Sequence, residues 1–284
     1  MTTDLRFRGA RPGRAIVLSV AQLLMGLYAL LIFYPLFNMI VSSFKTTREI
    51  FQHPFALPVH IVLSNYKVVW IDRGFGRYFA NSLVVTLVAM AFVLLLGSMA
   101  AYGVGRYRYR LRTFVFMLFL SGIMLPLKAA IIPLFMLIKG LGLMNTRAAI
   151  VLIFLAMGLP STVFILSGFM RSIPLELEHA ARIDGCNDWG IYQRIVMPVT
   201  TPAIALVTIY NAVPLWNDFF FPLVFLQSNA LKTLPVGLTT FFGQFSTDWS
   251  LLFTGLSIAI IPMLVLYLFM SRWFIRGLTA GAIK

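Results

Sequence analysis

The side chains able to do chemistry are few in this chain, and they gather in one stretch. Four of its nine acidic residues lie between Ile173 and Pro198, within an otherwise strongly apolar sequence. The three histidines are scattered and no Ser/His/Asp arrangement is visible, so neither catalysis nor metal binding is predicted. A polar stretch of this length cannot lie in lipid. We therefore expect a folded element outside the membrane that contacts a partner.

The composition places this stretch in a membrane protein. The 284 residues are 60% hydrophobic and 11% charged, whereas a soluble domain is about half apolar and a quarter charged. The net charge of +14 is typical of basic residues that flank membrane helices, and nucleic acid is not a predicted partner. The single cysteine, Cys186, excludes an intrachain disulfide and every multi-cysteine metal site.

Six apolar segments have the roughly 20 residues that a membrane helix needs. We expect an all-α integral membrane protein with a cytoplasmic tail over 1–14 and a single membrane domain over 15–284. With the N-terminus inside, the inner segments hold 14 lysines and arginines and the outer segments hold 8, which favours both termini in the cytoplasm. The predicted spans are 15–40, 80–105, 113–138, 147–170, 199–226 and 251–271.

The polar loop at 171–198 lies between the fourth and fifth predicted spans, on the cytoplasmic side. Ser172 is placed to cap a first short helix, with Pro174 in the first turn. Gly185 is placed to end that helix, and either Asn187 or Asp188 is suited to cap a second one. A short, capped and rigid helix can transmit motion between a partner and the membrane bundle.

The spacing within this loop resembles the "EAA" loop of ABC-importer permeases. In that family the pattern is Glu-Ala-Ala, three residues, Gly, nine residues, Ile, any residue and Leu-Pro. His179 stands where the family has Glu, and Met197 replaces Leu. The run A-A-R-I-D-G at 180–185 is similar to the sugar-importer branch. The residues that keep the spacing here are Ala180, Ala181, Gly185, Ile195 and Pro198.

Other stretches resemble the same family, over nearly the whole chain. The run W-N-D-F-F-F-P-L begins at Trp216, I-P-L-F begins at Ile132, and L-G-L-M-N-T begins at Leu141. The tail R-G-L-T-A-G-A-I-K ends at Lys284. The likeness is closest to the second permease of maltose-type importers.

The resemblance implies a type I ABC-importer permease fold with six transmembrane helices in a bacterial or archaeal plasma membrane. It implies a second permease, two ATPase subunits and an extracellular solute-binding protein as partners, besides membrane lipid. ATP and Mg are expected on the ATPase, since this chain has no G-x-x-x-x-G-K-[ST] phosphate loop and is expected to hold no cofactor. The residues expected to dock the ATPase are Glu178, His179, Ala180, Ala181, Asp184, Gly185, Ile195 and Pro198.

Polar residues inside the spans are candidates for the translocation path, because lipid penalises them. For Asp218, a structural cap at a helix break and a direct solute contact both remain open. Lys128 is interpreted as reaching outward to the membrane interface. Lone polar residues such as Asn81 are interpreted as hydrogen-bonding between helices. The predicted path residues are Asn211, Trp216, Asn217, Asp218 and Phe219.

An ion-coupled secondary transporter of a small solute is the alternative function. It would need more intramembrane carboxylates and an internal repeat, whereas we find one aspartate and no repeat. The residues do not specify the solute, and disaccharides, oligosaccharides and glycerol-phosphate-like solutes all remain open.

Overall fold

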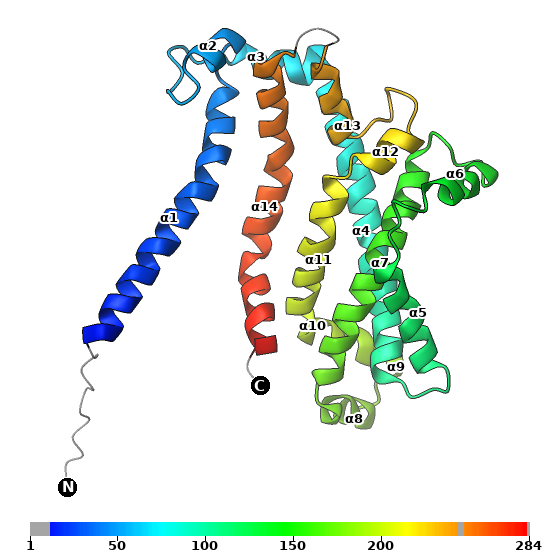
Figure 1. Ribbon diagram of the computed structural model, residues 1–284. Helices are drawn as coiled ribbons and strands as arrows, with labels where there is room; N and C mark the ends of the chain where they lie inside the picture. Colours follow the sequence, from blue (N-terminus) through cyan, green and yellow to red (C-terminus); the bar gives the residue numbers. More distant parts are fainter. Residues whose placement is uncertain (1–11, 244–246, 283–284) are drawn as a thin grey trace.

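The computed structural model describes residues 12–243 and 247–282, and almost all of the regular structure in them is helical. Residues 1–11 of the predicted cytoplasmic tail lie outside the described residues, and the first helix begins at Pro12. Within the described residues, four helices are long and apolar enough to cross a membrane (Figure 1). They are α1 (Pro12–Ser42), α4 (Phe75–Arg106), α7 (Arg147–Ser172) and α14 (Trp249–Ala282).

The third predicted span, 113–138, is wrong as a single helix. The structure divides it into α5 (Arg112–Met124) and α6 (Ile131–Gly140). Leu125 ends the first half in an extended conformation, with φ −78° and ψ 120°. The physical reason is Pro126, whose ring disfavours helical backbone at the residue before it and which has no N–H to donate.

The fifth predicted span, 199–226, is also wrong as a single helix. It contains α11 (Thr201–Trp216) and α12 (Phe220–Phe225), separated by three residues. The carboxylate of Asp218 accepts the backbone N–H of Phe221 at 2.9 Å and so starts a new helix. A second bend of 74° separates α11 from the helical run that precedes it, Asp188–Val199.

The remaining helices are short and gather at the two ends of the bundle (Figure 1). At the upper end in that view lie α2 (Thr47–Gln52), α3 (Ser64–Lys67), the π-helix η1 (Val68–Asp72), α13 (Leu234–Leu238) and the 3-10 helix η3 (Thr239–Phe241). At the lower end lie α8 (Leu175–Ile183), α9 (Asp188–Ile191), the π-helix η2 (Tyr192–Val196) and α10 (Met197–Val199).

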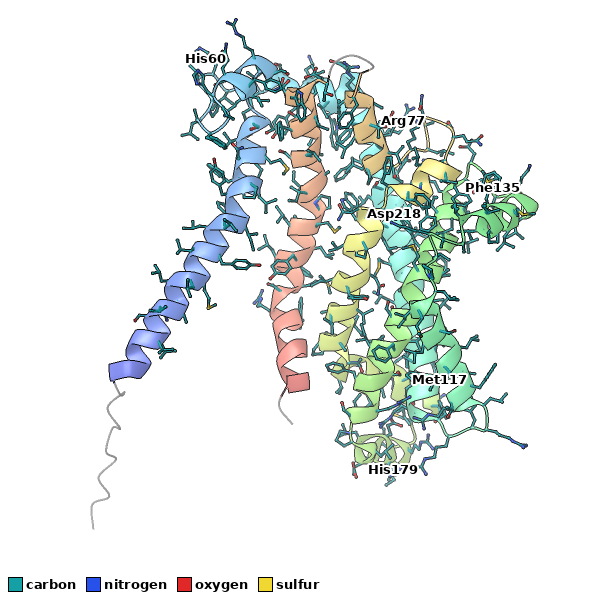
Figure 2. All side chains as sticks on the ribbon, in the orientation of Figure 1. His60, Arg77, Met117, Phe135, His179 and Asp218 are labelled. Carbon is teal, nitrogen blue, oxygen red and sulfur yellow. The ribbon has the colours of Figure 1, made fainter. Side chains whose placement is uncertain are left out.

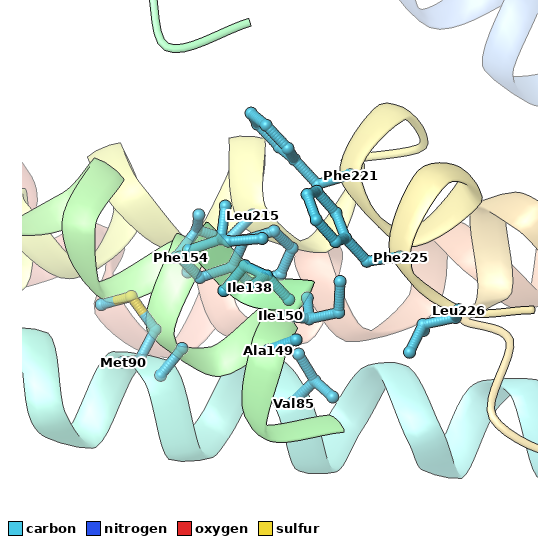
Figure 3. Close-up of a cluster of buried hydrophobic side chains, with 13 residues drawn as sticks. Val85, Met90, Ile138, Ala149, Ile150, Phe154, Leu215, Phe221, Phe225 and Leu226 are labelled. Carbon is cyan, nitrogen blue, oxygen red and sulfur yellow. The ribbon is translucent and has the colours of Figure 1, made fainter. Parts of the chain in front are cut away.

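The packed centre of the bundle lies between α4 and α7, against which α5, α11 and α12 also pack. Figure 3 shows one buried cluster, in which Val85 and Met90 of α4 meet Ile150 and Phe154 of α7, with Phe221 of α12 beside them. The predicted interhelical role of Asn81 is confirmed, because its side-chain oxygen accepts hydrogen bonds from Arg147 at 2.8 and 3.1 Å.

Gly97 allows α4 and α7 to approach closely. A Cβ atom at this position would lie 2.4 Å from the side chain of Thr162 on α7. We expect Gly97→Val to destabilise the bundle by about 1–3 kcal/mol through overpacking, measured as a lower unfolding temperature in detergent. Gly103→Val is the matched control, since a Cβ there meets nothing within 4 Å on the same helix. Equal losses in the two variants would contradict the close-approach explanation.

α1 stands apart from this core. It diverges from the other long helices toward its N-terminal end (Figure 1) and contacts mainly α14. From Val17 to Phe37 its large apolar side chains are exposed on all sides, with Leu31 and Met25 at 71% and 70%. Such a surface is stable only against lipid or against another protein chain.

Candidate docking helix and membrane cavity

The polar loop forms a short helix, α8, that projects at the lower end of the bundle, where His179, in the middle of this helix, is labelled in Figure 2. The predicted cap at Ser172 is wrong. Ser172 is the last residue of α7, where its hydroxyl donates to the carbonyl of Phe169 at 2.8 Å, and it lies two residues before the capping position of α8. Pro174 occupies the capping position instead, and α8 begins at Leu175.

The other end of α8 is closed as predicted. Gly185 has a φ of +84°, in the left-handed region that favours glycine. The N–H of Cys186 donates to the carbonyl of Ala181 at 2.9 Å, and that of Gly185 donates to Arg182 at 3.1 Å, which is a Schellman closure. Of the two candidate caps for α9, the structure uses Asn187, whose oxygen accepts the N–H of Gly190 at 2.8 Å.

The predicted docking residues divide between two faces of this loop. His179, Ala180, Asp184, Gly185 and Pro198 are exposed, Ile195 is half-buried, and Glu178 and Ala181 are buried. Sequence reasoning missed the apolar part of the exposed face. Ile183, the last residue and hence the tip of α8, is 86% exposed, and Leu175 and Leu177 are also exposed. The available signal was a large aliphatic residue in a polar segment outside the membrane.

Glu178 faces the bundle, where it meets Arg106 at the end of α4. The guanidinium Nε donates to a Glu178 carboxylate oxygen at 2.5 Å, and the two side chains are 5% and 6% exposed. Arg106 Nη1 also donates to the carbonyls of Met170 and Ile173, at 3.0 and 2.8 Å. One arginine therefore joins α8 to the ends of both α4 and α7. Sequence reasoning counted Arg106 only as a loop charge.

A second contact holds the loop against α4. The ring of Tyr192 in η2 packs on Tyr102, with 5.3 Å between the centroids, and its hydroxyl lies 2.8 Å from that of Ser98. Burial, and then a hydrogen bond to Asp188, raises the pKa of Tyr107 beside them. Like other tyrosine hydroxyls, that of Tyr107 is protonated at neutral pH, and it can donate to the Asp188 carboxylate.

A cavity of about 550 Å³ lies where the two broken spans meet. Polar groups from α7 and α11 line it: Ser161 donates to the Asn211 side-chain oxygen at 3.0 Å, and Tyr210 is 56% exposed. Asn211 also donates to Thr162 at 3.2 Å, so it links the two helices as well as facing the cavity.

Lys128 joins one helix break to the other. Its ammonium lies 3.7 Å from the Asp218 carboxylate, so it turns toward the second break rather than only outward as the sequence interpretation had it. Asp218 is 6% exposed and caps α12 through Phe221. The cap predicted as one alternative is therefore present, and the same carboxylate also faces the charge of Lys128.

The other predicted path residues do not gather at the cavity. Trp216 is 2% exposed, and its indole donates to the carbonyl of Ala259 in α14 at 3.0 Å. It belongs to the core between α4 and α14. Asn217 donates back to Val213 at 2.9 Å, and Phe219 is 39% exposed. Among the five predicted residues, only Asn211 lines the cavity and only Asp218 pairs with a residue that does.

A multi-pass helical bundle has broken spans around a cavity with a few polar groups, and a buried ion pair holds a capped helix at one end. This architecture fits a membrane transport subunit that a partner protein moves. The pattern of the "Binding-protein-dependent transport system inner membrane component" family matches residues 93–280. The chain belongs to this family. It is accordingly a multi-pass permease component of an ABC importer and not the ATPase, which is a separate subunit.

Several relatives match over most of the chain. It is 36% identical to the probable ABC transporter permease protein YurM of Bacillus subtilis, over 91% of this chain and 86% of the relative. It is 32% identical to the diacetylchitobiose uptake system permease protein NgcG of Streptomyces coelicolor, over 94% and 89%. It is 33% identical to the melibiose/raffinose/stachyose import permease protein MelC of Bacillus subtilis, over 96% and 99%.

A solved structure shares the fold. A chain in the crystal structure of a bacterial ABC transporter that imports the acidic polysaccharide alginate superposes with a TM-score of 0.81 at 25% identity. The match covers 93% of this chain and 99% of that one. A second crystal structure, of an alginate ABC transporter in complex with a periplasmic protein bound to an alginate pentasaccharide, has a TM-score of 0.65 at 14% identity.

Proposed function

We propose that this permease forms half of the translocation path for a sugar or a related solute, delivered by an extracellular binding protein. The observation that carries the proposal is the family match combined with relatives whose names state oligosaccharide uptake. The same match favours an ATP-driven importer over the ion-coupled secondary transporter. The six expected membrane passes are then α1, α4, α5 with α6, α7, α11 with α12, and α14.

The cytoplasmic side is the end that carries α8. The first residue of α1, the last residue of α14 and α8 all lie toward the same end of the molecule (Figure 1). The short basic loop R-Y-R-Y-R-L-R from Arg106 to Arg112 lies at that end too, which is the side on which lysine and arginine accumulate. Both termini are therefore proposed to be cytoplasmic.

The exposed face of α8 is proposed to dock into a cleft on one ATPase subunit. ATP and Mg are proposed to bind to the ATPase subunits and not to this chain. Ile183 would enter that cleft, because an 86% exposed aliphatic side chain gains most from burial there. Glu178 would act through Arg106 rather than touch the ATPase, because its carboxylate is buried against the bundle.

The exposed surface of α1 supports a second permease as partner. A helix that is apolar on all sides and packs poorly on its own bundle has surface to offer another chain as well as lipid. The segments at the opposite end from α8, 43–74 and 226–243, would then face the binding protein.

Affinity purification from native membranes in mild detergent tests the proposal. We expect a second permease, an ATPase and a solute-binding protein to be recovered with this chain. Recovery of the chain alone, also after cross-linking from residues 173–198, would contradict it.

Ile183→Glu is expected to abolish recovery of the ATPase while the second permease is retained, because it places a charge in the proposed apolar contact. Ile61→Glu is the matched control, since Ile61 is 68% exposed at the opposite end of the bundle. Undiminished recovery of the ATPase with Ile183→Glu would show that the tip of α8 is not the docking surface.

A further inference from the structure

Both helix breaks border the same cavity. Leu125, Pro126 and Lys128 of the first break line it, and so do Leu215 and Phe221, which flank the second. Irregular backbone at membrane depth is tolerated only where protein buries it or where it lines a water-filled space. Half-helices that meet in this way are a recurrent way to build solute sites in transport proteins.

The cavity also gathers the polar groups that a solute would need. Lys128, Tyr210, Ser161 and Asn211, which carry an ammonium, two hydroxyls and an amide, all line it. The other walls include apolar side chains such as Met157 and Phe221. A volume of about 550 Å³ lies within the usual range of small-molecule sites, about 300–1,000 Å³.

Within the ion pair, Lys128 is the member available to a ligand. Its side chain is 63% exposed, while that of Asp218 is 4% exposed. One oxygen of Asp218 accepts the backbone N–H that caps α12, and the other lies 3.7 Å from Lys128, too far for the ammonium to donate a close hydrogen bond to it. The ammonium therefore has donors free for a third group.

We propose that this cavity is a solute-binding site within this subunit, that it takes an uncharged polyhydroxylated ring, and that Lys128 donates a hydrogen bond to it. The inference rests on the proposed function and names its site. The ion pair is neutral as a whole, so an additional charge on the solute would remain uncompensated in a site of low polarity. A hydroxyl can accept from Lys128 and donate to Asn211 or Ser161, and the faces of a sugar ring suit the apolar walls.

A comparison of Lys128→Met with the double variant Lys128→Met/Asp218→Asn separates solute binding from structural pairing. Lys128→Met leaves a buried carboxylate unpaired, so both stability and uptake are expected to fall. The double variant removes that charge, while Asn at position 218 still caps α12. Its unfolding temperature is therefore expected to return to the wild-type value.

Uptake by the double variant is nevertheless expected to stay low. The assay uses the complete complex in proteoliposomes with radiolabelled melibiose and N,N′-diacetylchitobiose, and with an alginate oligosaccharide as the acidic probe. For the sugar that the wild type carries, the kcat of the double variant is expected to fall at least about tenfold. A fall of this size corresponds to the loss of one hydrogen bond from a charged donor. KM is expected to stay unchanged, because the binding protein sets it. Uptake at the wild-type rate by the double variant would overturn the role of Lys128.

Two further results would overturn parts of the scheme separately. Faster uptake of the acidic probe than of the neutral sugars by the wild type would contradict the proposed solute class. If none of the three probes stimulates ATP hydrolysis by the wild-type complex or enters the vesicles, the proposed sugar import itself fails, independently of the Lys128 variants.

Discussion

Arg106→Met is expected to uncouple ATP hydrolysis from transport and to destabilise the lower end of the bundle. The substitution leaves the Glu178 carboxylate buried without its partner and also removes the hydrogen bonds to Met170 and Ile173. Breaking one side of a buried ion pair costs about 3–5 kcal/mol. Because Arg106 joins α8 to both α4 and α7, motion of a docked α8 would no longer reach the membrane helices.

The measurement compares ATP hydrolysed with solute taken up by the reconstituted complex, together with the unfolding temperature. Arg182→Met is the matched control. Arg182 pairs with Asp188 at 2.8 Å in the same loop, but the two side chains are 53% and 55% exposed, and surface pairs contribute about 0–1 kcal/mol. Arg106→Met should therefore lose coupling while Arg182→Met keeps it. Normal coupling in Arg106→Met would exclude the ion pair as the mechanical link.

Gly185→Val is expected to abolish uptake while the complex continues to hydrolyse ATP. A β-branched residue with a φ near +84° costs about 1–3 kcal/mol in backbone strain. The simplest relief is to unwind the last turn of α8, which carries the exposed face proposed to dock. A Cβ at this position meets no atom within 4 Å, so the membrane bundle itself should keep its unfolding temperature.

Gly185→Asn is the control for this second prediction. Asparagine adopts the left-handed conformation more readily than other non-glycine residues, so most of the coupling should survive. The readout is the number of ATP molecules hydrolysed per solute transported. Wild-type uptake by Gly185→Val would rule out the closure of α8 as a requirement for coupling.

Hydropathy predicted the four long membrane helices well, because each is a continuous apolar run. It failed at 113–138 and 199–226, where the spans are broken. A window average reports how apolar a segment is and is insensitive to a bend within it. Proline content does not supply the missing information, since Pro35, Pro160, Pro214 and Pro262 all remain inside helices while Pro126 follows a helix end.

Whether a proline stays inside a helix or follows a helix end depends on the tertiary structure around it. A freed carbonyl within a membrane helix needs a neighbouring helix or water to satisfy it, and only the folded chain shows where a cavity lies. The break after Met124 and the break at Asn217 border one such cavity, although they are distant in the sequence.

The sequence by itself determined the membrane class, the existence of the polar loop and the end of its first helix at Gly185, because composition and local backbone preferences act over a few residues. It left the cap of the second helix open between Asn187 and Asp188, and the structure uses Asn187. It did not determine which side chains of that loop face outward. Glu178 turns inward because Arg106, 72 residues earlier, lies beside it, and Lys128 turns toward Asp218 across two helix breaks. Pairings of this kind depend on how distant helices pack, which only the tertiary structure decided.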